Sequence, residues 1–496
     1  MQTVGKGAVY LYAETMLRLL SAYLLWILLS KLSTPEIIGT SATVISLASI
    51  LATIASLGVP MAIPRLLGKS FSENDHGNAS RFAKLSVLIV SIGTVLCSFI
   101  VFVTRDWVYS DLSTDMMILS LLLLASIAIA TLLRSIMIAT LEVKILPIFT
   151  TVSSLLMVTI AISLVLLGAG AVGVVIAYIC FHTIFSVLLC FSLAKVFGYS
   201  NNHENKIQSS FSDTTRNILR TSLPSWIPAL IAIIGSGEVG TIALFGSVGP
   251  GQAGTYYLAY TIFSALAAIT YSIFSIAFPM LSGMHERRKE VLWKFLKSNL
   301  ILSLPISSVL IFYADNVMIL FGRDYALGSD SLQIFLVSIF PISLFMGITT
   351  LVYAYGNYRQ VLMLGLSLTI PRLVFYFILI AYYGSTGAAL SFTIGSITGF
   401  IASVIVSKRI GLLLYWKDIL ILVAFPLGIS FAFKYSGINY LIGIFLSILV
   451  SYLVFLRLGV LTREDIGNIL GLIMPAGLSR SVLNKLDSFR KRSDRS

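Results

Sequence analysis

The sequence predicts an all-α membrane protein of about 14 transmembrane helices, built as two parallel six-helix repeats followed by two extra C-terminal helices. Two observations support this class. Hydrophobic residues make up 57% of the 496 residues and charged residues only 11%, with a mean hydropathy of +0.95. In addition, motifs of the first half recur in the second half at an offset of about 215 residues. Such a composition cannot cover a soluble protein, so lipid must be the solvent of this fold.

Apolar segments long enough to cross a bilayer follow one another along the chain. A helix needs about 20 largely apolar residues to cross the hydrocarbon. We expect the spans at residues 8–30, 38–62, 83–104, 116–140, 146–168, 171–197, 220–246, 255–281, 293–313, 331–355, 361–382, 386–407, 414–433 and 437–456.

The duplication is visible in short motifs that keep their internal spacing. Proline, glycine and small residues carry most of the matches. The motif 35–40 recurs at 250–255, the motif 62–68 at 277–283, Gly170 and Gly173 recur as Gly384 and Gly387, and Lys195 and Gly198 recur as Lys408 and Gly411. Six helices per repeat leave the second half with the orientation of the first, so the repeats are expected to be parallel.

These boundaries divide the chain into two lobes and three further segments. We predict an N-lobe at 1–198, a cytoplasmic connector at 199–219, a C-lobe at 220–412, two extra helices at 413–456 and a tail at 457–496. In the tail, Leu478, Val482, Leu486 and Phe489 recur at helical spacing among basic residues. The pattern is typical of a basic amphipathic helix on the inner leaflet, or else of a charged tail that only enforces topology.

The basic residues indicate how the chain is oriented. With both termini in the cytoplasm, 27 of the 34 Lys and Arg residues fall inside, and four fall outside. Cytoplasmic loops are enriched in these residues, so we expect a multi-pass protein of the cell membrane with both termini in the cytoplasm. The net charge of +13 is explained by this topology and needs no nucleic-acid partner.

No pattern in the sequence indicates an enzyme site, a cofactor or a metal. The glycine pattern 235–240 lies inside an apolar span, whereas a dinucleotide site would require it after a strand. The four histidines have no metal-ligand spacing, and the three cysteines fall inside apolar spans.

Five charged residues lie inside the expected spans, namely Glu14, Arg18, Arg134, Glu238 and Arg372. Each costs at least about 2.5 kcal/mol to insert, so it should face a cavity or a partner. We predict that Arg18, Arg134, Arg372 and Glu14 bind substrate. For each the alternative is structural: Glu14 and Arg18 could neutralise each other one turn apart, Arg134 could extend to the interface, and Arg372 could pair with a carbonyl freed by Pro371.

Glu238 is the predicted ion-coupling residue. Gly235, Gly237 and Gly240 surround it and should make this span pliable. A desolvated carboxylate at such a place could exchange H⁺ or bind Na⁺. An acid that only supports helix packing is the alternative.

Several segments together resemble one family of transporters. They are 320–326 (LFGRDYA), 249–256 (GPGQAGTY), 354–357 (AYGN), 384–390 (GSTGAAL), 57–60 (LGVP), and the pairs at 133–134 and 141–142. In order and spacing they resemble the polysaccharide-exporter branch of the multidrug/oligosaccharidyl-lipid/polysaccharide (MOP) superfamily. The resemblance implies two six-helix lobes that form a V around a polar lumen. Where the family often has an acidic or Asn-rich seventh span and an Asn-rich eleventh span, this chain has Glu238 and Arg372 instead.

The function implied by this resemblance is a flippase that moves a polyprenyl-(di)phosphate-linked oligosaccharide from the inner to the outer leaflet by alternating access. Its expected partners are this lipid, membrane lipids, H⁺ or Na⁺, and glycan-assembly enzymes. Arginine suits the diphosphate because its guanidinium donates paired hydrogen bonds to phosphate oxygens. The alternative is a cation-coupled drug or metabolite antiporter of the same superfamily, for which a net acidic lumen would be expected.

Overall fold

In the computed structural model, the chain is helical throughout the residues that the structure describes, which are 2–73, 75–105, 112–198, 211–462 and 465. No strand occurs in these ranges. The expected all-α class is therefore confirmed. The predicted amphipathic helix of the tail, and most of the connector from residue 199, lie outside the described ranges.

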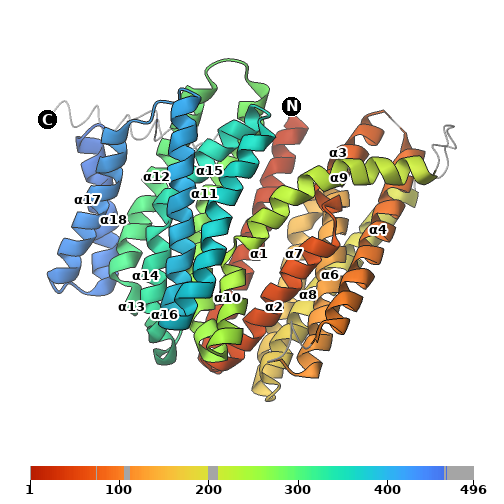
Figure 1. Cartoon of the computed structure of the whole chain (residues 1–496), viewed down its shortest axis with the longest axis horizontal. Coiled ribbons are helices and arrows are strands. Elements are labelled where there is room, and N and C mark those ends of the chain that lie inside the picture. The colour runs from red at the N-terminus through yellow and green to blue at the C-terminus, as the bar shows by residue number, and fades with distance from the viewer. Residues whose placement is uncertain (1, 74, 106–111, 199–210, 463–464, 466–496) are drawn as a thin grey trace. The chain divides into compact units, whose positions relative to one another are not determined.

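The long helices carry the predicted spans, and short helical segments join them (Figure 1). The described elements are α1 (Gln2–Leu32), α2 (Pro35–Ala55), α3 (Val59–Ser72), α4 (His76–Val103), α6 (Thr114–Ala139), η1 (Val143–Ile145), α7 (Leu146–Leu166), α8 (Gly170–Gly198), α9 (Phe211–Ile234), α10 (Gly237–Ser247), α11 (Pro250–Gly283), α12 (Arg288–Phe312), α13 (Ala314–Ile319), η3 (Arg323–Gly328), α14 (Ser329–Val337), α15 (Ile339–Ala354), α16 (Tyr358–Arg409), α17 (Trp416–Tyr435) and α18 (Tyr440–Arg457).

Thirteen of the described helical stretches are long and apolar enough to span a membrane. The 52-residue α16 counts once among them, although Gly384 inside it leaves helical geometry at φ 52° and ψ −129°. The two predicted spans at 361–382 and 386–407 lie on either side of this glycine. The number of spans therefore agrees with the expected figure of about 14.

Two predicted spans are interrupted in the structure. The span expected at 38–62 ends with α2 because Leu57 and Gly58 both adopt left-handed backbone angles, which a right-handed helix cannot contain. The span expected at 220–246 divides into α9 and α10, because Ser236 is extended at ψ 165°. The sequence did not reveal either break, because the residues on both sides of each one are hydrophobic.

By internal contacts the chain forms two compact units. Unit 1 comprises residues 1–261, 320–328 and 373–388, and unit 2 comprises 262–319, 329–372 and 389–496. In unit 1, α7 packs against α1 and α8, and α6 packs against α2, α3, α4 and α8. In unit 2, α12 packs against α14, α15, α17 and α18. These two units are defined by contacts and not by the sequence repeat, so the predicted boundaries of the two lobes stay a prediction.

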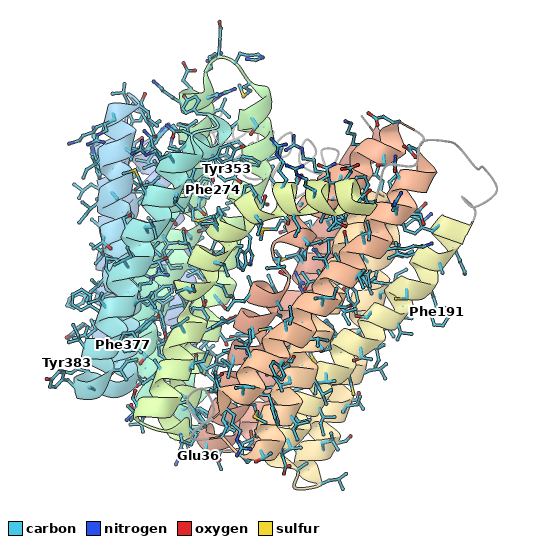
Figure 2. The ribbon with its side chains drawn as sticks, turned by 45° about the vertical axis from the view of Figure 1, so that its right-hand side comes forward. Glu36, Phe191, Phe274, Tyr353, Phe377 and Tyr383 are labelled. Atoms are coloured by element: carbon cyan, nitrogen blue, oxygen red, sulfur yellow. The ribbon has the colours of Figure 1, made fainter. Side chains whose placement is uncertain are left out.

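Large apolar side chains remain exposed on both units, as expected where lipid is the solvent. Figure 2 shows Phe191 on α8 and Phe377 on α16, both in unit 1, which are 68% and 84% exposed. In unit 2, Phe445 on α18 is 68% exposed. Within unit 2, the interior is tightly packed around aromatic rings, with Phe263, Phe335 and Phe392 in mutual contact at centroid distances of 5.2 to 5.4 Å. Exposed apolar residues outside and aromatic packing inside fit a multi-pass membrane protein.

Candidate functional site

Glu14 on α1 and Arg134 on α6 form a buried ion pair inside unit 1. Arg134 Nε donates to Glu14 Oε1 at 3.2 Å, and Arg134 Nη2 lies 2.5 Å from Glu14 Oε2. The Glu14 side chain is only 1% exposed, and that of Arg134 is 23% exposed. This paired geometry is the strongest that an arginine and a carboxylate can form, so Arg134 takes both oxygens of Glu14.

Arg18 lies beside this pair but is held much less tightly. Its Nε is 4.0 Å from Glu14 Oε1, and its side chain is 47% exposed. The expected alternative, in which Glu14 and Arg18 simply neutralise each other, does not describe this arrangement, because Arg134 is the principal partner of Glu14. Two guanidinium groups therefore share one carboxylate, and one positive charge is left uncompensated in the cluster.

The depth of the cluster follows from helix geometry. At 1.5 Å per residue, Arg18 lies about 4 Å from the middle of the span Val9–Leu32, and Glu14 lies about 10 Å from it. Arg134 lies about 11 Å from the middle of the span Thr114–Ala139, towards its C-terminal end. The first and fourth spans cross the membrane in opposite directions. The N-terminal part of the first span therefore lies at the level of the C-terminal part of the fourth, which brings Glu14 and Arg134 to a similar depth. Arg18 thus places a charge that is only loosely paired with Glu14 near the centre of the span.

Arg372 is placed inside unit 2 and is 4% exposed. Its Nε donates to the Phe392 carbonyl at 3.0 Å, its Nη2 donates to Ser396 Oγ at 2.7 Å, and its guanidinium lies 3.6 Å from the Phe392 ring centroid. A Cβ on Gly395 would overlap Arg372 Cγ, so this glycine makes room for the side chain. Arg372 links the two halves of α16 and is not open to solvent.

Glu238 lies in the first turn of α10, directly after the break at Ser236. Its Oε2 and the Ser236 Oγ are both buried, and neither has a hydrogen-bond partner among the described residues. A buried carboxylate oxygen without a partner is costly, which makes it an unusual feature of a packed helix. The structure thus places an unsatisfied acid at a helix break.

Tyrosines that the sequence analysis did not single out surround this break. Tyr376 on α16 lies 3.5 Å from the Ser236 carbonyl and 3.4 Å from the hydroxyl of Tyr256 on α11. A Cβ on Gly237 would overlap the Tyr260 ring, and one on Gly240 would overlap the Tyr256 hydroxyl. Gly237 and Gly240 therefore leave room for these tyrosine side chains, while the pliability expected of this span stays a prediction. Only the high tyrosine content, 22 residues, could have drawn attention to these rings.

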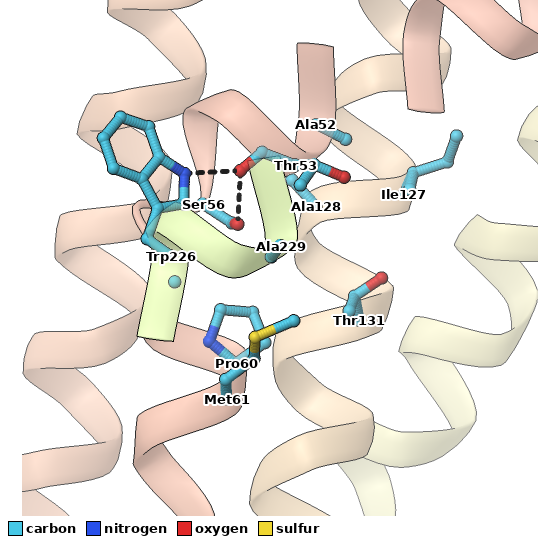
Figure 3. Close-up of a pocket in the computed structure, with 11 residues that line it drawn as sticks. Ala52, Thr53, Ser56, Pro60, Met61, Ile127, Ala128, Thr131, Trp226 and Ala229 are labelled. Atoms are coloured by element: carbon cyan, nitrogen blue, oxygen red, sulfur yellow. Dashed lines mark hydrogen bonds between the residues drawn. The ribbon is translucent and has the colours of Figure 1, made fainter. Parts of the chain in front are cut away.

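A small cavity of about 100 Å³ lies where α2, α3, α6 and α9 meet in unit 1 (Figure 3). Figure 3 shows the Trp226 indole nitrogen donating to the Thr53 carbonyl, at 3.1 Å, with the Ser56 hydroxyl donating to the same oxygen at 3.0 Å. Cavities that hold organic ligands usually measure about 300 to 1,000 Å³. This one is too small for a glycan and instead seats Trp226 against the break between α2 and α3.

The described residues contain no group of His, Cys, Asp and Glu side chains that could hold a metal ion. The charged residues that the sequence analysis selected thus fall into three places. Glu14, Arg18 and Arg134 come together in unit 1, Glu238 lies at the helix break in the same unit, and Arg372 belongs to unit 2.

Comparison with solved structures identifies the fold. A structure of the lipid II flippase MurJ in an inward closed conformation matches with a TM-score of 0.71 and 17% identity, over 91% of this chain and 98% of that one. An inward-facing multidrug resistance MATE family transporter of the MOP superfamily matches at 0.61 and 17% identity, over 82% and 98% of the two chains. The fold is therefore that of MOP transporters.

A third similar structure is a MOP superfamily transporter from Pyrococcus furiosus, described as having a reversed polarity of its binding pocket that suggests a different function. It matches with a TM-score of 0.51 and 17% identity, over 82% of this chain and 95% of that one. No curated protein matches the chain by sequence. The polysaccharide biosynthesis protein family matches residues 4–285, more than half of the chain. The chain is a member of the polysaccharide biosynthesis protein family, and it has the fold of the MOP superfamily.

Proposed function

We propose that the protein is a flippase that transfers a polyprenyl-(di)phosphate-linked oligosaccharide from the inner to the outer leaflet for cell-surface glycan synthesis. The family and the MurJ-like fold support transport of a lipid-linked glycan precursor. The observation that carries the proposal is the half-exposed Arg18 near the middle of its span, 4.0 Å from a carboxylate that Arg134 already binds. A charge at this depth is costly in lipid, so Arg18 faces a polar path and serves an anionic cargo.

The cargo has three parts with different solvents. Its polyprenyl chain stays in lipid, whereas the phosphate groups and the glycan need a polar path. Arg18 binds the phosphate oxygens through its guanidinium group, and the Glu14–Arg134 pair holds α1 in place beside α6. An inside-negative potential favours outward movement of an anion by about 2.3 kcal/mol per charge per 100 mV, so alternating access would have an electrical driving force.

Arg372 is a second proposed phosphate ligand, with a condition that its surroundings impose. To reach the cargo its guanidinium must leave the Phe392 carbonyl and Ser396 Oγ. This exchange would occur only in another conformation of the transport cycle. If Arg372 never leaves these partners, its function is to hold the two halves of α16 together.

Glu238 is proposed to couple transport to H⁺ or Na⁺. Its unsatisfied Oε2 could gain a proton or a cation ligand, and the break at Ser236 lets α10 move relative to α9. Glu238→Gln should therefore give transport that no longer responds to the ion gradient. Asp115→Asn, an exposed acid at the start of α6, is the control and should keep the response.

Native mass spectrometry of the gently solubilised protein tests the main proposal. We expect a co-purified mass equal to a polyprenyl phosphate glycan, lost in Arg18→Ala and partly kept in Arg18→Lys, which retains the charge without the paired donors. Arg65→Ala removes an exposed arginine of α3 and should change nothing. Stabilisation by organic cations without a bound glycolipid would instead favour the antiporter.

A further inference from the structure

Unit 2 contains a second, larger cavity that none of the residues considered so far occupies. Its volume is about 720 Å³, within the range of cavities that bind ligands. It is formed by the loop between α11 and α12, the first two turns of α12, the end of α15 and the segment before α17. The described lining residues are His285, Arg287, Arg288, Lys289, Glu290, Trp293, Lys294, Tyr355, Gly411, Leu412, Leu413 and Tyr415.

The charges of this lining are strongly unbalanced. Four of its side chains are Arg or Lys, and Glu290 is the single carboxylate among the described lining residues. Arg287 takes that carboxylate, with its Nη2 at 2.7 Å from Glu290 Oε2. Lys289 makes no ion pair within the described ranges, although its Nζ lies 3.3 Å from where a Cβ of Gly411 would stand. The cavity is therefore an anion site by composition.

Arg288 makes the wall of the cavity rigid. Its Nε donates to the Met284 carbonyl, its Nη1 donates to the Ala354 carbonyl at 3.3 Å, and its guanidinium lies 5.3 Å from the Tyr355 ring centroid. These contacts join the loop before α12 to the end of α15. The remaining cations thus stand on a fixed frame, which lowers the entropic cost of binding a ligand.

The N-terminus of α12 adds to the positive electrostatic potential of this cavity. Arg287 is the N-cap residue and provides no side-chain cap. Arg288, Lys289 and Glu290 follow it in the first turn, and Arg287 already pairs with Glu290. A helix N-terminus carries a partial positive charge, so basic residues there are electrostatically unfavourable without a bound anion. The uncapped backbone N–H groups point out of the helix end and are themselves suitable donors to phosphate oxygens.

The cavity also has an apolar side, which identifies the source of the anion. The Trp293 and Tyr415 rings lie 4.9 Å apart, Leu413 is 76% exposed and the neighbouring Trp416 is 47% exposed. The spans of α12 and α17 begin at this same level. Aromatic rings beside cations where spans begin are typical of the membrane interface. The ligand should therefore combine a charged group with acyl chains.

We propose that this cavity binds the phosphate head group of an anionic membrane lipid in the leaflet that faces the basic loops. Lys289, Lys294 and the start of α12 would hold the phosphate, while Leu413 and Tyr415 would contact the first carbons of the chains. The proposal does not depend on the glycan cargo, because it rests on residues of unit 2 that are separate from Arg18 and its partners.

Lipid titration of the detergent-solubilised full chain tests this site. Phosphatidylglycerol should bind, as seen by native mass spectrometry, and raise the melting temperature, whereas phosphatidylcholine should do neither. Removing two cations with Lys289→Gln and Lys294→Gln should weaken phosphatidylglycerol binding by about tenfold or more. Replacing both with arginine should preserve it. Lys417→Gln, which removes a cation of α17 outside the lining, is the matched control.

Three outcomes would overturn the proposal. Equal binding of phosphatidylglycerol and phosphatidylcholine would show that charge is not recognised. Full stabilisation by inorganic phosphate, with nothing added by the lipid, would identify a site for a soluble anion. Unchanged phosphatidylglycerol binding in the glutamine variant would show that these lysines do not hold the lipid. If the same variant lost binding of an acidic polypeptide, the cavity would be a protein-docking surface. Flippase activity enters none of these readouts, so failure of this site would leave the proposed function intact.

Discussion

Gly39 on α2 and Gly254 on α11 hold the same position in two copies of one sequence motif, and unit 1 packs them directly against each other. A Cβ on Gly39 would overlap the Pro250 carbonyl oxygen, and a Cβ on Gly254 would overlap the Pro35 carbonyl oxygen. The contact is reciprocal, as expected where two equivalent helix starts cross about a local two-fold axis. The repeated glycines are thus explained by close approach of two backbones.

This crossing predicts that Gly39→Ala destabilises the protein. An added methyl group must push the start of α2 away from α11, since the atoms it would meet belong to the rigid backbone. Overpacking of this kind costs about 1–3 kcal/mol. The measurement is the melting temperature in detergent. Gly68→Ala is the matched control, because nothing lies within 4 Å of its Cβ position in α3, and it should be neutral or slightly stabilising. Equal effects at both glycines would contradict the interpretation.

The Glu14–Arg134 pair should matter far more for stability than an exposed pair. Glu14→Gln leaves the Arg134 guanidinium without its buried charge partner, at a cost of about 3 kcal/mol or more. Glu142 and Lys144 form a comparison pair in the same unit, 3.7 Å apart with side chains 48% and 66% exposed. Glu142→Gln should cost about 0.5 kcal/mol or less. Chemical denaturation in mixed micelles would compare the two, and similar losses would mean that Glu14 is better solvated than its burial indicates.

The sequence was sufficient for the class of fold, and it drew attention to Glu14, Arg18 and Arg134 because charge within apolar spans is rare and costly. Their role in binding substrate stays a prediction. The sequence could not identify the closer of the two partners of Glu14. Spacing of four residues suggested that Glu14 serves Arg18, whereas the tertiary structure brings Arg134 to Glu14 from a position 120 residues away. Likewise, Tyr256 and Tyr376 meet only because α11 and α16 are neighbours, and no local pattern carries that information.

The sequence predicts which glycines correspond in the two repeats, but it does not predict the backbone angles that they adopt. Gly170 and Gly384 match in the duplication, and they adopt nearly the same left-handed angle, with φ of 50° and 52°. Gly170 is the first residue of α8, and Gly384 separates the two helical halves of α16. Both matched glycines thus stand where one helix ends and the next begins.

Ser396→Ala should reveal how Arg372 is held. The Ser396 hydroxyl accepts from Arg372 Nη2 at 2.7 Å, and its loss leaves one donor of a buried guanidinium without that partner. Hydrogen bonds to charged groups contribute about 1.5–3 kcal/mol. Ser403→Ala on the same helix is the control, because that buried hydroxyl bonds only to its own helix, at the Phe400 carbonyl, in the contacts described. Thermal unfolding should separate the two variants, and equal melting temperatures would show that the Ser396 hydroxyl does not help to hold Arg372.

The last described residue, Asp465, should anchor the chain after α18 to α12. Its Oδ2 accepts from Lys297 Nζ at 2.8 Å and from the Thr462 backbone nitrogen at 2.8 Å, and both charged side chains are nearly buried. Asp465→Asn removes the charge partner of Lys297 at a cost of about 3 kcal/mol. Faster amide hydrogen exchange at Thr462 would report the loss. Asp418→Asn, in the first turn of α17, should leave this exchange unchanged.

The same contact has a defined pH dependence. Burial alone would raise the pKa of the Asp465 carboxyl, but hydrogen bonds from Lys297 and Thr462 outweigh it and hold that pKa below its ordinary value. A lowered pKa in the docked state means that the undocked state binds the proton more readily. Docking is therefore fully stabilised above the ordinary pKa of about 3.9, and the stabilisation is lost as the pH falls through the lowered value. Exchange at Thr462, corrected for its intrinsic pH dependence, should stay protected at neutral pH and lose protection only in strong acid. Asp465→Asn should abolish this change, and a midpoint above the ordinary pKa would show that burial outweighs the hydrogen bonds.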